Sequence, residues 1–203
     1  MLFGGHSGGL ELRKRASGAL ALRGRFPYNK RAVLSDGGRT GRPRKEVIAP
    51  RAFAYRVNIP TEDIHFLIGH SYDRPLASRG AGTLLLNDSD EALTFEAEIS
   101  EEMQDVTYVR DFLAGFTAGL IMGLSPGFRI PPARTVPDAE TVEEEDPEEG
   151  EAIIRTVNQA LLYEISAVTR PAYDEAQIEA RTWAASEAAG HRPLVNHLNR
   201  WRL

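Results

Sequence analysis

The sequence predicts a mostly β, α+β protein, built as a small antiparallel-rich β-barrel with surrounding helices. Short apolar segments of strand length recur along the chain, about seven in all, and most follow one another without a helical segment between them. Only two longer segments have apolar residues at helical spacing. Strands that are neighbours in sequence favour an antiparallel sheet or barrel over a doubly wound parallel sheet.

Composition narrows the class of protein further. The chain has 203 residues and no cysteine, and 42% of its residues are hydrophobic. A chain of this length can bury about 70% of its unfolded surface without disulfides, and the lack of cysteine excludes thiolate metal sites and a cysteine nucleophile. No apolar run reaches the ~20 residues of a membrane helix, and the N-terminus lacks the apolar core of a secretion signal. We therefore expect a cytoplasmic protein with no membrane contact.

The first quarter of the chain combines an arm, one strand and a loop. Residues 1–17 are rich in glycine and then basic, which predicts a flexible basic N-terminal arm. Residues 18–26 alternate apolar and other side chains, as a half-buried strand does. Residues 35–46 contain Gly-Gly and Gly-x-Pro and predict a loop. A helical turn is expected within residues 47–57.

The middle of the chain holds the densest strand signals. Residues 63–69 form an apolar run that ends at a glycine, which is typical of a buried strand. Residues 82–86 and 93–99 flank a polar turn, and apolar and polar residues alternate in the second of these strands. Residues 101–118 follow Ser100, a good N-cap, and have apolar residues near helical spacing, so we expect a helix there.

The last third contains three more strands and a long polar segment. A kinked strand is expected in LIMGLSPGFRI, and regular strands at 153–157 and 161–168. Residues 131–151 are rich in proline and then in acidic residues, which predicts a solvated or disordered loop. A helix is expected from Asp174 to about Ala189.

Charge is unevenly distributed along the chain. Residues 1–56 hold 13 Lys/Arg and 3 Asp/Glu, whereas residues 138–151 hold 9 Asp/Glu and no basic residue. The basic segment is either a solvated flank or a contact for nucleic acid or an acidic partner. Because no aromatic residues interleave regularly with its arginines, nucleic-acid recognition is disfavoured.

Several common catalytic motifs are absent. The sequence has no phosphate-binding GxxxxGK[ST], no GxGxxG after a strand and no HExxH. His65 and His70 have no nearby carboxylates at metal-ligand spacing. We therefore expect neither a metal site nor a cofactor.

Three residues remain as candidates for chemistry, and each also has a purely structural explanation. His70 lies where an apolar strand meets a polar segment, so one ring nitrogen can be held and the other exposed, as a general base requires. Ser125 lies between two glycines, which either bring amides near a substrate oxyanion or mark a tight bend. Glu164 is a single acid in an apolar run, so it needs a buried partner or an outward position.

Taken in the order His, Ser, acid, three separated blocks resemble the tailed-phage prohead proteases. These are capsid maturation serine proteases, distantly similar in fold to the herpesvirus assemblins. The blocks are IHFLIGHSYDRPLAS around His70, GLIMGLSPGF around Ser125 and LLYEISAVTRPAY around Glu164. The resemblance covers about residues 18–178, so it implies a herpesvirus-protease-like domain there and a C-terminal tail at 179–203.

The resemblance implies a triad in which Ser125 is the nucleophile, His70 the general base and Glu164 the acid that orients the imidazole. Assemblins have a histidine in the third position, so the acid departs from them, and Asp73 is the rival orienter of His70. A second departure is Pro126, which follows the serine and has no amide hydrogen for an oxyanion hole. Oxyanion or substrate support would then come from Gly127, Arg129 and Arg170.

The resemblance also implies a substrate and a place of action. A prohead protease cleaves the scaffolding region of the major capsid protein, and then itself, inside the immature capsid in the host cytoplasm. We expect a homo-oligomer whose tails bind the scaffold or are removed by self-cleavage. Three alternatives stay open: an inactive scaffold or capsid-interaction protein of the same fold, a nucleic-acid-binding barrel with salt-dependent DNA binding, and the same protease in a gene-transfer agent.

Overall fold

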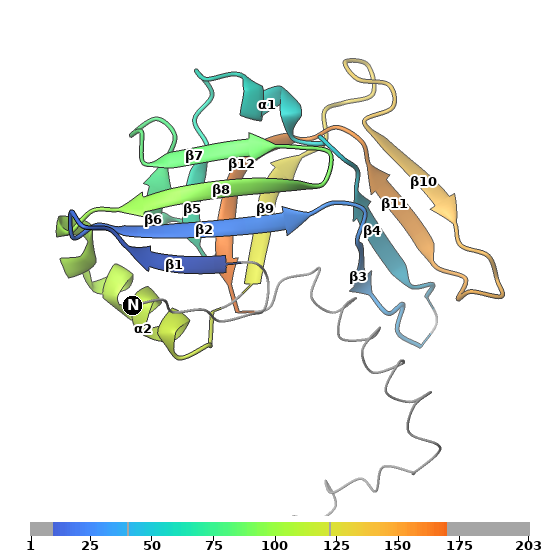
Figure 1. Ribbon diagram of the computed structural model, residues 1–203. Helices are drawn as coiled ribbons and strands as arrows, with labels where there is room; N and C mark the ends of the chain where they lie inside the picture. Colours follow the sequence, from blue (N-terminus) through green and yellow to red (C-terminus); the bar gives the residue numbers. More distant parts are fainter. Residues whose placement is uncertain (1–9, 40, 122, 170–203) are drawn as a thin grey trace, which may run out of the picture.

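The computed structural model describes residues 10–39, 41–121 and 123–169 (Figure 1). Within them, twelve strands form three four-stranded sheets, joined or covered by α1 (Ala54–Asn58), the 3-10 helix η1 (Glu102–Asp105) and α2 (Thr107–Thr117). This confirms the mostly β, α+β class. The described strands form three separate sheets rather than the single barrel that the sequence predicts. The likeness to herpesvirus proteases stays a prediction, and the predicted C-terminal helix and tail lie outside the described residues.

The first sheet is antiparallel throughout and has the order β1-β2-β8-β7. Its strands are β1 (Leu10–Lys14), β2 (Leu20–Pro27), β7 (Leu84–Asp88) and β8 (Ala92–Ile99). In β8 the predicted alternation is confirmed, since Phe95 and Ala97 are buried while Glu96 is not. Strand β1 corrects the prediction of a flexible arm for residues 10–14, because its apolar residues Leu10 and Leu12 are buried. Residues 1–9 of that arm lie outside the described residues.

The second sheet has the order β10-β11-β4-β3 and contains one parallel pair, β11 with β4. Its strands are β3 (Arg31–Ser35), β4 (Arg44–Ile48), β10 (Glu140–Glu144) and β11 (Ile153–Val157). Strand β10 corrects the expected solvated loop at 131–151. All five of its residues are exposed, yet they pair in continuous register with β11. Backbone pairing to a strand inside the sheet can hold an edge strand that has no buried side chains.

The uneven charge of the sequence is partly neutralised inside the chain. Glu145, just after β10, is buried and accepts hydrogen bonds from Lys45 Nζ at 2.7 Å and Arg31 Nη1 at 3.2 Å. Arg42 forms an ion pair with Glu144 at 3.2 Å. Basic residues of the N-terminal quarter therefore lie beside the acidic segment, and these contacts account for part of the basic segment without an external acidic partner.

The third sheet has the order β6-β5-β12-β9, with β12 parallel to β5 and antiparallel to β9. Its strands are β5 (His65–Ile68), β6 (Ser71–Ser78), β9 (Gly123–Arg129) and β12 (Leu161–Val168). β12 has the bounds that the sequence predicts. β6 replaces the polar loop expected after His70. Its central Pro75 is tolerated because β6 is an edge strand, where a missing amide hydrogen interrupts no second ladder.

The hydrophobic core lies between the first and third sheets and beneath α2. Phe95 of β8 and Phe66 of β5 meet with ring centroids 4.8 Å apart, and β2 and β8 cross over the third sheet in Figure 1. Helix α2 buries Val109, Phe112 and Phe116, which recur at the spacing of one helix face. The helix expected here is confirmed except for its first turn, which is η1. This packing fixes β5, β12 and β9 as a rigid support.

Candidate active site

His70 lies in the tight turn that connects β5 to β6. Ile68 and Ser71 are paired in the ladder, and both residues between them have positive φ, +59° at Gly69 and +62° at His70. Two such residues are typical of a type I′ hairpin turn. Glycine adopts this conformation freely, but for histidine it is uncommon. The His70 amide is held by a hydrogen bond to Ser166 Oγ at 2.9 Å.

Glu164 of β12 is the partner of the His70 ring. Its Oε1 lies 2.7 Å from His70 Nδ1, and its Oε2 accepts a hydrogen bond from Ser166 Oγ at 2.7 Å. Glu164 is 4% exposed, and each of its carboxylate oxygens has a hydrogen-bond partner within the protein, as a buried carboxylate requires. The His70 side chain is 47% exposed, and Nε2 is the ring nitrogen that Glu164 leaves available. This geometry is that of an oriented base at the surface of a sheet.

Ser125 lies on β9, in the strand next to Glu164. It pairs in register with Ser166, and Gly127 pairs with Glu164. Directly paired residues of an antiparallel ladder project from the same face, so β9 presents Ser125 on the face that carries the carboxylate and the clamp on His70. Ser125 is half-buried, and its hydroxyl makes no hydrogen bond with the described residues. The structure thus brings the three predicted catalytic residues onto one face of one sheet.

Gly127 explains why a carboxylate fits between the two strands. A Cβ atom at this position would lie 1.9 Å from Glu164 Oε1 and 2.6 Å from its Cδ. Any other residue here would therefore displace the carboxylate. The sequence predicts Gly127 as an oxyanion donor, a role that stays a prediction. What the structure shows is that Gly127 makes room for Glu164.

The other predicted site residues have different positions. Asp73, the rival orienter, is exposed on β6 and forms no hydrogen bond or ion pair with His70, whose Nδ1 faces Glu164 instead. Arg129 ends β9, and its guanidinium lies 5.4 Å from the centre of the Tyr163 ring. Arg170 lies outside the described residues.

Sequence reasoning missed Ser166, whose fully buried hydroxyl joins the His70 backbone to the Glu164 carboxylate. A signal was present. Ser166 lies two residues after Glu164 in a strand, so both side chains project from one face, and a buried acid needs donors. The local pattern of this segment predicts only an apolar strand with one acid.

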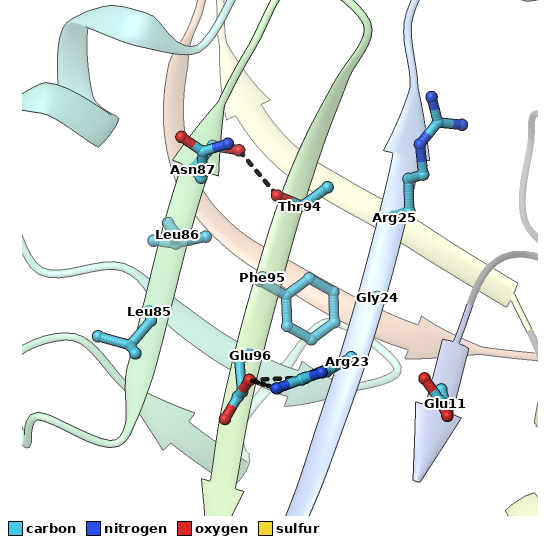
Figure 2. Close-up of a pocket in the computed structure, with 10 residues that line it drawn as sticks. All are labelled: Glu11, Arg23, Gly24, Arg25, Leu85, Leu86, Asn87, Thr94, Phe95 and Glu96. Carbon is cyan, nitrogen blue, oxygen red and sulfur yellow. Dashed lines mark hydrogen bonds and ion pairs between the residues drawn. The ribbon is translucent and has the colours of Figure 1, made fainter.

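A surface hollow of about 460 Å³ lies elsewhere, on the first sheet, and contains none of the three candidate catalytic residues (Figure 2). Gly24 and Phe95 form part of its lining, and the charged side chains of Arg23 and Glu96 pair with each other at 2.6 Å. The lining of this hollow contains no histidine and no serine, so the candidate site remains the face of the third sheet.

Comparison with known proteins shows the family of this chain. The sequence model of the caudovirus prohead serine protease family matches residues 34–189. The chain therefore belongs to that family. No curated protein and no solved structure matches it. The matched range includes the strands and the turn that carry His70, Ser125 and Glu164. No helix of the described residues is long and apolar enough to cross a bilayer.

Proposed function

We propose that this chain is a serine endopeptidase that cleaves the scaffolding region of the major capsid protein, and then itself, inside the immature capsid in the host cell. The observation that carries the proposal is the hydrogen-bonded set of His70, Glu164 and Ser166 on the sheet face that also presents Ser125. Family membership supports the prohead as the place of action.

In the proposed mechanism, Ser125 Oγ attacks the carbonyl carbon of the scissile peptide bond as His70 Nε2 accepts its proton. His70 then gives that proton to the leaving amine as the C–N bond breaks. A water molecule, activated in the same way, hydrolyses the acyl-enzyme. Glu164 accepts the Nδ1 hydrogen bond, which fixes the ring and stabilises the imidazolium that forms.

Two further parts complete the proposed site. Ser166 holds Glu164 Oε2 and the His70 amide, so it keeps base and carboxylate in one arrangement. The tetrahedral oxyanion needs donors other than the residue after the nucleophile, because Pro126 has no amide hydrogen. The Gly127 amide, Arg129 and Arg170 are the candidates, and a donor of this kind contributes about 3 kcal/mol to transition-state binding.

The test is intact-mass spectrometry of the purified chain and of the capsid protein co-expressed with it. We expect the wild type to trim the capsid protein and its own tails, and Ser125→Ala to lose this activity by a factor of about a million. Ser35→Ala, an exposed serine on β3, is the matched control and should cleave normally. If wild type and Ser125→Ala leave both proteins whole, the chain is an inactive capsid-interaction protein instead.

A further inference from the structure

An arginine–tyrosine cluster lies beside the candidate triad. Tyr163 precedes Glu164 at a bulge, since Leu162 pairs with Phe128 and Glu164 with Gly127, which leaves Tyr163 as the extra residue. The Arg56 guanidinium of α1 lies 4.2 Å from the centre of the Tyr163 ring, and that of Arg129 lies 5.4 Å from it. Both distances are within the range of cation–π contact. The bulge therefore supplies an aromatic platform for two cations next to the catalytic carboxylate.

The two cations differ in how they are compensated. Arg56 is nine-tenths buried and pairs with Glu62 Oε2 at 2.7 Å. The carboxylate of Asp63 already has another partner, because its Oδ1 accepts a hydrogen bond from the Gly80 amide at 2.8 Å. Arg129 is exposed and has no carboxylate partner among the described residues. Within the part of the chain that the structure describes, Arg129 is therefore the cation of this cluster that no carboxylate neutralises.

Tyr72, at the start of β6, shows how closely these groups gather. Its side chain is exposed, and its ring lies 5.6 Å from that of His65, which pairs with Glu164. The pKa of Tyr72 is raised overall, because partial desolvation and the Glu164 carboxylate raise it more than Arg56 and Arg129 lower it. One face of the third sheet thus carries the candidate triad at one end. At the other end it carries Arg129, whose positive charge has no carboxylate partner among the described residues.

The spacing of Ser125 and Arg129 on β9 indicates which substrate residue Arg129 could reach. Ser125 and Arg129 are four residues apart in one strand, so their Cα atoms lie about 13 Å apart. Tyr163 holds the guanidinium beside the middle of this interval. Strand β9 is an edge strand of the third sheet, and an extended peptide can run along such an edge. Successive side chains on one side of that peptide are about 7 Å apart, so Arg129 lies level with a residue two to four positions from the cleaved bond.

We propose that Arg129, held on Tyr163 beside Arg56, is a substrate subsite that binds an acidic side chain two to four residues from the scissile bond. This inference rests on the proposed peptidase function and gives its substrate a chemical class. It also separates Arg129 from the oxyanion role, because a subsite acts only on substrates that carry the acid, whereas an oxyanion donor acts on all of them.

The first test is cleavage of a proteome-derived peptide library, read by mass spectrometry. For the wild type we expect Asp and Glu to be enriched at one fixed position within that interval. Arg129→Ala should lose the enrichment, with about a tenfold lower kcat/KM on acidic peptides and little change on their amide twins. Arg129→Glu should favour Lys or Arg at the same position. Arg110→Ala, an exposed arginine on α2, is the matched control and should keep the wild-type profile.

The second test measures binding without catalysis. Fluorescence anisotropy would measure how tightly the Ser125→Ala variant binds the labelled scaffolding segment of the capsid protein. The same measurement would be made with a twin segment in which every Asp and Glu is replaced by Asn or Gln. Adding Arg129→Ala should weaken binding of the native segment about tenfold and leave the twin unchanged. Equal binding by both proteins, or an unaltered library profile, overturns the subsite. A uniform loss of rate on every peptide makes Arg129 an oxyanion donor. Selective binding without any cleavage contradicts the peptidase function alone.

Discussion

Two buried glutamates in neighbouring parts of the molecule show what separates a structural carboxylate from a reactive one. Glu145, next to the second sheet, and Glu164, in the third, are 5% and 4% exposed. Glu145 accepts from Lys45 Nζ at 2.7 Å and from Arg31, so permanent cations surround it. Glu164 faces a histidine ring and a serine hydroxyl instead.

The two glutamates differ in whether the group that contacts the carboxylate can change its charge. The hydrogen bond and charge of Lys45 lower the pKa of Glu145, which stays a fixed anion that closes an ion pair. Glu164 has no permanent cation in contact with its oxygens in the described structure. Its charge becomes fully compensated only when His70 gains a proton, which is the step that a general base performs. A buried acid whose partner can change its charge is therefore the one suited to catalysis.

Among the changes that test the comparison between the two glutamates, the largest effect is expected from Glu164→Gln. The amide keeps the shape of the side chain but cannot orient the imidazole or stabilise its cation, so kcat should fall by about 10⁴. Thermal melting should show that the protein stays folded. The matched control is Asp73→Asn on the exposed rival, which should leave kcat unchanged. If the two variants exchange these results, Asp73 orients the base and the comparison between the glutamates fails.

The next effect is expected from Gly127→Ala. The added methyl falls within 1.9 Å of Glu164 Oε1, so the carboxylate must leave its position beside His70. A misplacement of about 1 Å can cost a factor of about 100 in rate. Shortening the acid in Gly127→Ala/Glu164→Asp should recover part of the loss, a coupling that a double-mutant cycle on kcat would measure. If the effects of the two substitutions on the activation free energy simply add, Gly127 does not act by making room for Glu164.

A smaller effect is expected from Ser166→Ala. Its removal leaves Glu164 Oε2 and the His70 amide without their partner, which should cost about 1–3 kcal/mol of stability. As a positioning residue, Ser166 should also change kcat by about tenfold while KM stays constant. Steady-state kinetics on the folded variant separate these effects. A loss of stability with normal kcat would make Ser166 a purely structural residue.

The smallest effect on activity is expected at the other glutamate. Glu145→Gln breaks the ion pairs of a buried carboxylate with two partly exposed cations, so it should cost about 2 kcal/mol of stability at pH 7, between the values for exposed and buried ion pairs, with no change in kcat. Since the folded pKa of Glu145 is depressed, its stabilisation is present above the unfolded value near 4.5 and is lost as pH falls through the folded pKa. The free energies of unfolding of the wild type and of Glu145→Gln, measured by denaturant titration, should therefore become equal at acidic pH. A constant difference at every pH would contradict this origin.

The parts of the molecule that the sequence predicts well are those with a buried face. The alternation in β8 and the apolar run of β12 indicate strands because burial imposes their pattern. β10 and β6 escape such reasoning, because edge strands held by backbone pairing need no apolar alternation. In the site, His70, Ser125 and Glu164 could be named from sequence, whereas the clamp by Ser166 and the close approach of Gly127 depend on strand register, which local patterns do not specify.

The central claim is that His70, oriented by Glu164, activates Ser125. A fluorophosphonate probe tests it directly, because it modifies a serine whose hydroxyl is activated by a base. Peptide mass spectrometry of the labelled wild type should place the adduct on Ser125, with labelling abolished in Ser125→Ala and His70→Ala and strongly slowed in Glu164→Gln. An adduct on another serine, or none on a folded wild-type protein, would contradict the account.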